Sequence, residues 1–170
     1  MQADDMPVAI KESAAVPRPR ESESVDDYLK AIYTLSGDTQ RRVGSKELAD
    51  RLSVAPASVT NMLQRLAAAQ DSLLLYERHH GVVLSPAGRK RALELVRHHR
   101  LIETFLYEVL GYEVDELHEE AERLEHFISE KFEERMAAKL GNPKADPHGH
   151  CIPAMDGTMP KQHRVSCTCE

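Results

Sequence analysis

The order of short helical and strand-like patterns in the first half of the chain constrains its fold most strongly. Three helical stretches and two strand-like runs follow one another at residues 24–36, 45–52, 56–69, 73–78 and 82–84. Ser45 is a suitable N-cap for the second helix, Pro56 suits the first turn of the third, and Gly81 lies in the turn between the strands. This order predicts a winged helix-turn-helix domain.

The sequence pattern of the second half of the chain predicts helices and no further strands. A long helical pattern begins at Pro86 and stops at Gly111, and another spans residues 114–140. The predicted fold class is therefore mainly α, with a winged helix-turn-helix domain followed by an all-helical domain. We expect a disordered tail at residues 1–23 and the winged-helix domain at residues 24–95. The helical domain is expected at residues 96–142, and an irregular C-terminal segment at residues 143–170.

The composition argues against a secreted, a membrane-spanning or a disulfide-rich protein. The 170 residues carry a formal net charge of −6, and the N-terminus lacks an apolar signal region. No uncharged apolar run approaches the roughly 18 residues of a membrane span. The three cysteines, Cys151, Cys167 and Cys169, do not make the framework of a disulfide-rich domain. We therefore expect a cytoplasmic protein without a membrane partner.

Charge is distributed unevenly, and this distribution favours DNA as a partner of the first half. Residues 25–95 contain ten bases and eight acids, whereas residues 96–170 contain nine bases and fifteen acids. Small and amide side chains on the third helix suit base edges, and basic side chains around it suit phosphates. The predicted base-reading positions are Ala57, Ser58, Thr60, Asn61 and Gln64, and the predicted phosphate contacts are Arg41, Arg42, Lys46, Arg65 and Arg78. A three-helix module that binds protein is the alternative.

An acidic cluster in the second half indicates a metal site. Residues 113–130 hold eight acids and one base, and His118, Glu122, Glu125 and His126 share one face of the predicted helix. Like charges one turn apart repel one another unless a cation neutralises them. Imidazole and carboxylate groups without a nearby thiol suit a divalent first-row metal.

The preceding predicted helix carries two polar residues on its apolar face. His99 and Glu103 fall on its apolar stripe, where buried polar groups need partners. Two antiparallel helices bring this pair towards Glu122 and His126. The joint pattern favours a metal site, and the alternatives are a core histidine with ordinary hydrogen bonds and a solvated acidic helix face.

Most of the chain resembles the diphtheria-toxin-repressor family of metal-dependent regulators, and its manganese-transport-regulator branch in particular. The resemblance covers about residues 24–155. It rests on Asp26-Asp27-Tyr-Leu-Lys30-Ala-Ile-Tyr33, Val54-Ala-Pro-Ala-Ser-Val59-Thr60, the wing at residues 76–85 and Glu122-x-x-Glu125-His126. It implies a helical dimerisation domain after the winged-helix domain, with metal sites between the two.

The resemblance implies a primary metal site made by Asp27, His99, Glu122, Glu125 and His126. The iron-responsive branch has Met and Cys at the positions of Asp27 and Glu122, so the hard oxygen ligands found here favour manganese. The manganese branch usually has Glu at the position of Lys30, which argues against a binuclear site that uses this position. By spacing alone, Asp27 also fits a capping box that starts at Ser24.

A second metal site is implied as well. His118 with His99 and Glu103 resembles the ancillary site of the iron branch. Asp146-Pro147-His148 resembles a segment that supplies further ligands in longer members of the family. Both sites require His99, and the sequence leaves its assignment open.

Together these features predict a homodimeric transcriptional repressor with Mn²⁺ as corepressor, which binds a palindromic operator of metal-uptake genes. An Fe²⁺-responsive repressor of the same family and a metal-free winged-helix regulator with a protein partner are the alternatives. We expect neither an enzyme nor an organic small-molecule substrate. The chain has no evident nucleophile–base pair, no HExxH motif, no Gly-rich phosphate loop and no second copy of its acidic cluster.

Overall fold

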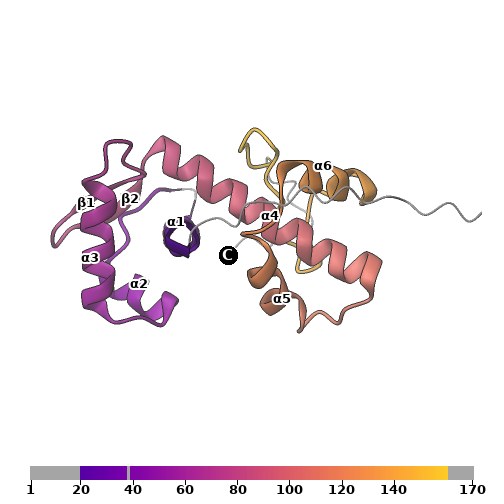
Figure 1. Ribbon diagram of the computed structural model, residues 1–170, viewed down its shortest axis with the longest axis horizontal. Helices are drawn as coiled ribbons and strands as arrows, with labels where there is room; N and C mark the ends of the chain where they lie inside the picture. Colours follow the sequence, from indigo (N-terminus) through magenta and orange to yellow (C-terminus); the bar gives the residue numbers. More distant parts are fainter. Residues whose placement is uncertain (1–19, 38, 161–170) are drawn as a thin grey trace, which may run out of the picture.

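The long helix α4 joins an N-terminal lobe to a C-terminal lobe (Figure 1). The computed structural model describes residues 20–37 and 39–160. Its elements follow the chain as α1 (Arg20–Ser36), α2 (Ser45–Leu52), α3 (Pro56–Ala67), β1 (Leu74–Glu77), β2 (Gly81–Leu84), α4 (Pro86–Leu110), α5 (Leu117–Leu124) and α6 (Glu130–Lys139). The mainly α fold class is confirmed, with three helices and a hairpin before the all-helical part.

The helices α1, α2 and α3 and the hairpin share one apolar core in the N-terminal lobe. Its fully buried side chains are Ile32, Val43, Leu48, Val59, Leu63, Leu74 and Val82. Ser53 takes a left-handed φ of 53° and ends α2, and Pro56 begins α3, so a short turn joins the two helices. The antiparallel hairpin ends with the pair of Glu77 and Gly81. This lobe places α3 and the hairpin at the end of the molecule far from α5 and α6 (Figure 1).

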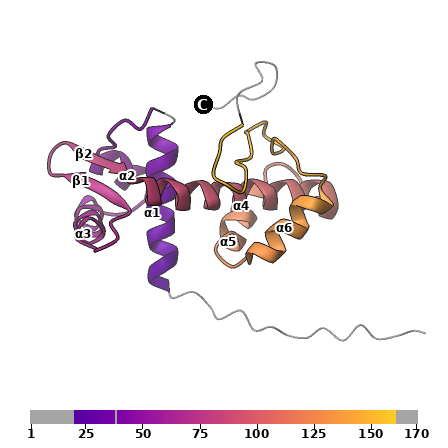
Figure 2. The same ribbon diagram turned by 90° about the horizontal axis from the view of Figure 1, so that it is seen from above.

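Helix α4 belongs to both lobes. Ser85 caps its start by accepting a hydrogen bond from the backbone N–H of Gly88 at 3.1 Å, and Gly111 ends it in a left-handed conformation. It packs against α1 through Ala92, Leu93 and Val96, and in the C-terminal lobe through Leu101, Ile102 and Leu106. Helix α1 crosses the N-terminal part of α4, and the rest of α4 extends into the C-terminal lobe (Figure 2), so the junction of the lobes lies where these two contact stretches meet.

The first helix begins earlier than predicted. Helix α1 starts at Arg20 and not near Ser24, because neither Pro nor Gly interrupts the sequence between residues 20 and 36. The capping box predicted from Ser24 to Asp27 is therefore wrong, since both residues lie inside the helix. Residues 1–19 of the predicted tail lie outside the described residues.

The predicted cap of the second helix is wrong by one residue. Gly44 and not Ser45 is the N-cap of α2, and its backbone N–H donates to Oε2 of Glu47 at 2.8 Å. The ends of α3, β1 and β2 differ from the predicted ends by one or two residues. Such differences are expected, because the last residues of an element make fewer backbone hydrogen bonds.

The helix predicted over residues 114–140 is wrong as a single element. The structure contains two helices, α5 and α6, separated by residues 125–129. Ser129 is extended and its Oγ accepts a hydrogen bond from the backbone N–H of Phe132 at 3.3 Å, so it caps a new helix where the first one stops. As a consequence, Glu125 and His126 lie in the turn after α5.

After α6 the chain follows an irregular path to residue 160. Ala145 pairs with Cys151 in an isolated bridge, and Arg97 of α4 donates to the carbonyl oxygen of Pro153 at 2.7 Å. Cys151 is buried and disulfide-bonded, and Ile152 joins the core of the C-terminal lobe. Within residues 20–37 and 39–160, no helix combines the length and the apolar character that crossing a bilayer requires.

Candidate metal centre

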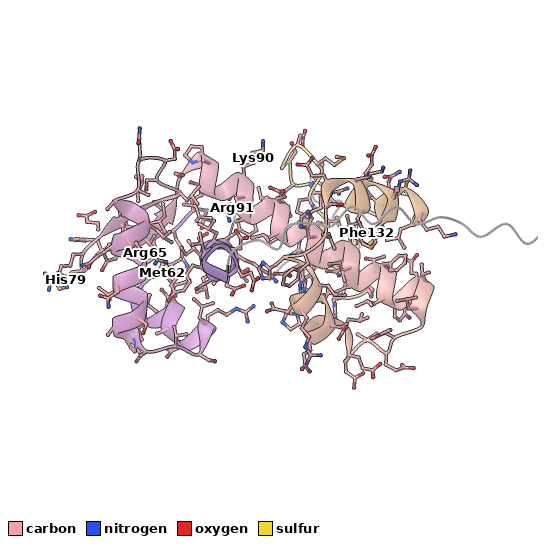
Figure 3. All side chains as sticks on the ribbon, in the orientation of Figure 1. Met62, Arg65, His79, Lys90, Arg91 and Phe132 are labelled. Carbon is pink, nitrogen blue, oxygen red and sulfur yellow. The ribbon has the colours of Figure 1, made fainter. Side chains whose placement is uncertain are left out.

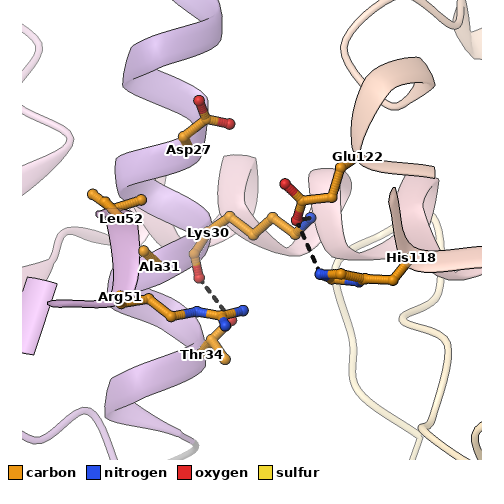
Figure 4. A pocket seen from close by; sticks show the side chains of 8 residues that line it. All are labelled: Asp27, Lys30, Ala31, Thr34, Arg51, Leu52, His118 and Glu122. Atoms are coloured by element: carbon orange, nitrogen blue, oxygen red, sulfur yellow. Dashed lines mark hydrogen bonds and ion pairs between the residues drawn. The ribbon is translucent and has the colours of Figure 1, made fainter. Parts of the chain in front are cut away.

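Polar side chains of α1, α4 and α5 meet at the junction of the two lobes. A cleft of about 280 Å³ opens there, and its lining residues are Asp27, Lys30, Ala31, Thr34, Arg51, Leu52, His118 and Glu122 (Figure 4). Helices α1 and α2 supply one wall, and α5 supplies the other. Among the described residues, three groups of His, Asp and Glu have ligand atoms within 4.8 Å of one another, and two of these groups lie at this junction.

The first group consists of Asp27, Glu125 and His126. Nε2 of His126 lies 3.0 Å from Oδ1 of Asp27 and 3.7 Å from Oε1 of Glu125. The side chain of Glu125 is fully buried, whereas 46% of the Asp27 side chain is exposed. Helix α1 supplies Asp27 and the turn after α5 supplies the other two, so the group joins the two lobes.

Lys30 extends from α1 into the same cluster and reaches Glu122 on α5 (Figure 4). Its Nζ lies 3.0 Å from Oε1 of Glu122, 2.9 Å and 2.7 Å from the two carboxylate oxygens of Glu125, and 3.2 Å from Nδ1 of His99. From the sequence we predicted only that this position lacks a carboxylate. The contacts of its ammonium group depend on how α1 and α5 each pack against α4.

His99 lies between two sets of potential ligands. Its Nδ1 is 2.6 Å from Oε2 of Glu125, and its Nε2 is 3.1 Å from both Oε1 of Glu103 and Nδ1 of His118. Glu103 in turn lies 3.6 Å from Nδ1 of His148. One ring nitrogen of His99 therefore faces each set.

The irregular segment after α6 brings a third group close to Glu103. Asp146 is buried, and its Oδ1 accepts hydrogen bonds from the backbone N–H groups of His148 and His150, both at 2.9 Å. Nδ1 of His150 lies 3.2 Å from Oδ2 of Asp146, and Nε of Arg100 lies 3.7 Å from the same oxygen. His150 was missed in the sequence, although its alternation with His148 after Asp146 was a usable signal.

A buried hydrogen-bond network of α4 and α6 side chains contacts the turn that carries Glu125. Nδ1 of His98 lies 3.2 Å from the backbone oxygen of Glu125, and its Nε2 lies 2.9 Å from Oε2 of Glu133 on α6. Arg97 contacts the same carboxylate. Groups that orient potential ligands in this way restrict the geometry of a metal site. The adjacent pair His98-His99 was the sequence signal, but only the fold shows that the two rings have different partners.

Two histidines of the junction, His126 and His99, have a raised pKa, whereas burial lowers the pKa of His118. The hydrogen bond to Asp27 raises the pKa of His126 above its ordinary value. Burial acts to lower the pKa of His99, but its hydrogen bonds to Glu103 and Glu125 outweigh burial, and the pKa is raised.

Two carboxylates of the junction, Glu122 and Glu103, have a lowered pKa and are held in their charged form. Burial acts to raise the pKa of Glu122, but the positive charge of Lys30 and its hydrogen bond outweigh burial and lower it. Burial likewise acts to raise the pKa of Glu103, and the hydrogen bond from His99 lowers it below its ordinary value. These oxygens are therefore available to a cation near neutral pH.

The predicted metal ligands lie close together and fall into three groups of side chains. Asp27, Glu125 and His126 make one group, and His99, His118 and Glu122 make another. Asp146 and His148 belong to the third group with His150, and Glu103 lies between the second and third groups.

Most of the side chains predicted to contact DNA are exposed on the outer part of the N-terminal lobe. The exposed ones are Arg41, Arg42, Lys46, Ala57, Ser58, Asn61, Gln64, Arg65 and Arg78. Thr60 is partly buried, and its hydroxyl donates to the carbonyl oxygen of Pro56 at 3.1 Å. Arg41 pairs with Glu47, and Arg42 pairs with Glu77. Figure 3 shows Arg65 on α3 and His79 at the tip of the hairpin, both on the side far from Phe132 of α6.

Two family models match the chain over most of its length. Residues 21–82 match the N-terminal DNA-binding domain of iron-dependent repressors, and residues 85–154 match the metal-binding and dimerisation domain of iron-dependent repressors. The boundary between the two matches falls at residues 83–84, the end of β2, just before the helix that joins the lobes.

Curated relatives and solved structures agree with these matches. An HTH-type transcriptional regulator MntR from Listeria welshimeri is 35% identical over 106 residues, which cover 62% of this chain and 72% of the relative. The MntR from Geobacillus kaustophilus is 38% identical over the same coverage of both chains. A solved manganese-dependent transcriptional repressor in complex with manganese is 43% identical with a TM-score of 0.74, and the match covers 82% of this chain and 63% of that chain. This chain thus spans less than two thirds of that solved protein.

Proposed function

Because the chain belongs to the diphtheria-toxin-repressor family of metal-dependent regulators, we propose that it is a Mn²⁺-responsive transcriptional repressor that controls metal-uptake genes in the cytoplasm. The observation that carries the proposal is the contact of Asp27 with His126 at 3.0 Å, which joins α1 of the DNA-binding lobe to the turn after α5. Metal binding regulates DNA binding when both depend on the same arrangement of the two lobes.

The donor groups at the junction fit a hard divalent cation. The proposed ligands of the primary site are Asp27, His99, Glu122, Glu125 and His126. They offer carboxylate oxygens and imidazole nitrogens without a thiol, and such a set suits Mn²⁺. A bound divalent cation would supply the positive charge that lets carboxylates of the two lobes share one centre. We assign a second site to Glu103, His118, Asp146 and His148, with His99 shared between the two sites.

Helix α3 is the proposed recognition helix. Its exposed side chains at Ala57, Ser58, Asn61 and Gln64 are small or carry amides, which suits contact with base edges in the major groove. A homodimer presents two copies of this helix, so we propose a palindromic operator with two half-sites. Arg65 and the basic residues near the hairpin are the proposed phosphate contacts, and they make the affinity for DNA fall with salt.

The partner in the proposed homodimer covers apolar side chains of the C-terminal lobe. Large exposed apolar residues gather near the end of α4 and around α5 and α6: Tyr107, Val109, Leu110, Val114, Leu124, Phe127 and Phe132. Exposed apolar groups in such numbers on one lobe favour an interface. A second copy of this lobe is the proposed occupant, since the lobe matches a dimerisation domain.

The decisive experiment compares DNA binding with and without Mn²⁺ in the wild type and in Asp27→Ala. A DNA duplex is first selected from a random pool with the Mn²⁺-loaded protein, and its affinity is then measured by fluorescence anisotropy. We expect Mn²⁺ to strengthen binding of the wild type by about 5- to 150-fold, the usual range of such coupling. Asp27→Ala should lose this stimulation and keep the weak binding of the chelator-stripped protein.

Asp115→Ala is the matched control, because it removes an exposed carboxylate from the loop before α5. It should respond to Mn²⁺ as the wild type does. Tight binding of the wild type in chelator would contradict the proposal and favour a metal-free regulator. Stimulation by Fe²⁺ but not by Mn²⁺ would favour an iron-responsive repressor.

A further inference from the structure

Three of the proposed metal ligands surround the ammonium group of Lys30. Its Nζ lies 2.7 Å and 2.9 Å from the carboxylate oxygens of Glu125, 3.0 Å from Oε1 of Glu122 and 3.2 Å from Nδ1 of His99. An ammonium group has three hydrogen-bond donors and no acceptor, so it uses the same lone pairs that a metal ion needs. Lys30 therefore competes with a metal ion for these ligand atoms.

The charge of Lys30 is shielded from water. Only 13% of its side chain is exposed, and the side chain of Glu125 is fully buried. Interactions between such buried charges are screened much less than those on the surface. Lys30 thus neutralises these carboxylates as a bound cation does.

The rest of the cluster is arranged around a different contact. Asp27 and His126 lie 3.0 Å apart, and Nε2 of His126 lies 3.7 Å from Oε1 of Glu125. Glu125 is therefore shared between this contact and the contact with Lys30. The carboxylate of Glu125 therefore joins two parts of the cluster, the Asp27–His126 pair and the contacts of Lys30. The second part already contains the positive charge of Lys30.

We propose that Lys30 is a built-in cation that restricts this cluster to a single Mn²⁺ and weakens the binding of that ion. The inference rests on the proposed function, and it adds that Lys30 sets the Mn²⁺ concentration at which the protein responds. A purely structural ion pair between α1 and α5 predicts the opposite effect. Its removal would loosen the cluster and weaken metal binding, whereas the removal of a competing cation strengthens it.

The test is a Mn²⁺ titration of chelator-stripped full-length chain, followed by electron paramagnetic resonance of the free ion. In Lys30→Met, which keeps the length of the side chain without its charge, Mn²⁺ should bind about ten-fold more tightly or better. Lys30→Glu adds a carboxylate at the same place. It should bind one more Mn²⁺ per chain and give the spectrum of two interacting ions at low temperature.

Two matched variants complete the test. Lys30→Arg keeps the charge and should not bind Mn²⁺ more tightly than the wild type, whereas Lys131→Met removes an exposed lysine of α6 and should behave as wild type. Circular dichroism checks the fold, and Lys30→Gln replaces Lys30→Met if the latter does not fold. Wild-type affinity in the uncharged variant together with wild-type stoichiometry in Lys30→Glu would overturn the proposal.

Asp27→Ala in the same titration tests the proposed function separately. If Asp27→Ala weakens Mn²⁺ binding while the Lys30 variants behave as wild type, only the role of Lys30 is wrong. If Asp27→Ala binds Mn²⁺ as the wild type does, the metal site between the lobes is wrong, and the proposed function fails with it.

Discussion

Glu133 on α6 exposes only 6% of its side chain and contacts His98 and Arg97 on α4. Burial acts to raise the pKa of this carboxyl, but the hydrogen bonds from His98 and Arg97 outweigh burial and lower it. The other ring nitrogen of His98 faces the backbone oxygen of Glu125. A single buried charge therefore connects α6 to the turn that carries two proposed metal ligands.

We expect Glu133→Gln to lower the free energy of unfolding at pH 7 by about 2–3 kcal/mol, because it leaves Arg97 without its buried partner. A carboxyl with a lowered pKa stabilises the fold above its unfolded pKa, and this contribution is lost as the pH falls through the folded value. The difference from the wild type should therefore shrink below about pH 4.3. Urea unfolding between pH 7 and pH 3 measures it, with the exposed Glu134→Gln as control. A difference that stays constant over this range would contradict the assignment.

At the scale of elements, the start of α4 approaches the N-terminal lobe so closely that one position has no room for a side chain. A Cβ atom at Gly88 would lie 1.8 Å from the carbonyl oxygen of Leu73 and 2.8 Å from its carbonyl carbon. These are backbone atoms of the segment that leads into β1, and they cannot rotate away. The position of α4, and with it of His99 and Glu103, depends on this contact.

We therefore expect Gly88→Ala to destabilise the protein by about 3 kcal/mol or more. Gly44→Ala is the matched control, since its Cβ would lie 3.4 Å from Oε2 of Glu47, the end of a flexible side chain. The control should change stability by less than about 1 kcal/mol. Chemical unfolding followed by circular dichroism compares the two, and equal effects would show that the approach of α4 is not limiting.

The elements also show how far the sequence can predict this molecule. The helical spacing and the hairpin signal predicted the order of elements, and the acidic pattern around Glu122 predicted a cluster near His99. The break at Ser129 was missed, because helical spacing continues across it and the cap acts through a local hydrogen bond. The contacts of Lys30 could not be predicted, because a long flexible side chain reaches its partners only once α1 and α5 are both packed against α4.

At the scale of the whole molecule, the two lobes expose different surfaces. The hairpin exposes Leu75, whereas the C-terminal lobe exposes several large apolar residues near Leu110. The proposed homodimer covers the second surface and leaves α3 free at the opposite end (Figure 1). DNA binding and dimerisation then use the two lobes at opposite ends of the folded molecule.

Leu110→Asp should shift the protein from dimer to monomer, because a charge within the proposed apolar interface loses its hydration without gaining a partner. Leu75→Asp is the matched control, since Leu75 is also exposed and lies on the hairpin. Sedimentation velocity at micromolar concentration measures the change, and we expect a weakening of dimerisation by about ten-fold or more. A dimer of unchanged stability would place the interface elsewhere.

The continuity of α4 has a consequence for which changes of chain length the protein tolerates. Each residue of an α-helix turns the chain by about 100° and advances it by about 1.5 Å. Inserting or deleting one residue between Val96 and Leu101 would rotate the C-terminal lobe by that angle, and His126 would no longer face Asp27. An insertion of seven residues nearly restores the angle but moves the lobes apart by about 10 Å. The number of residues in this stretch therefore sets both the rotation of the C-terminal lobe about the axis of α4 and the distance between the lobes. This constraint does not depend on which side chains the stretch contains.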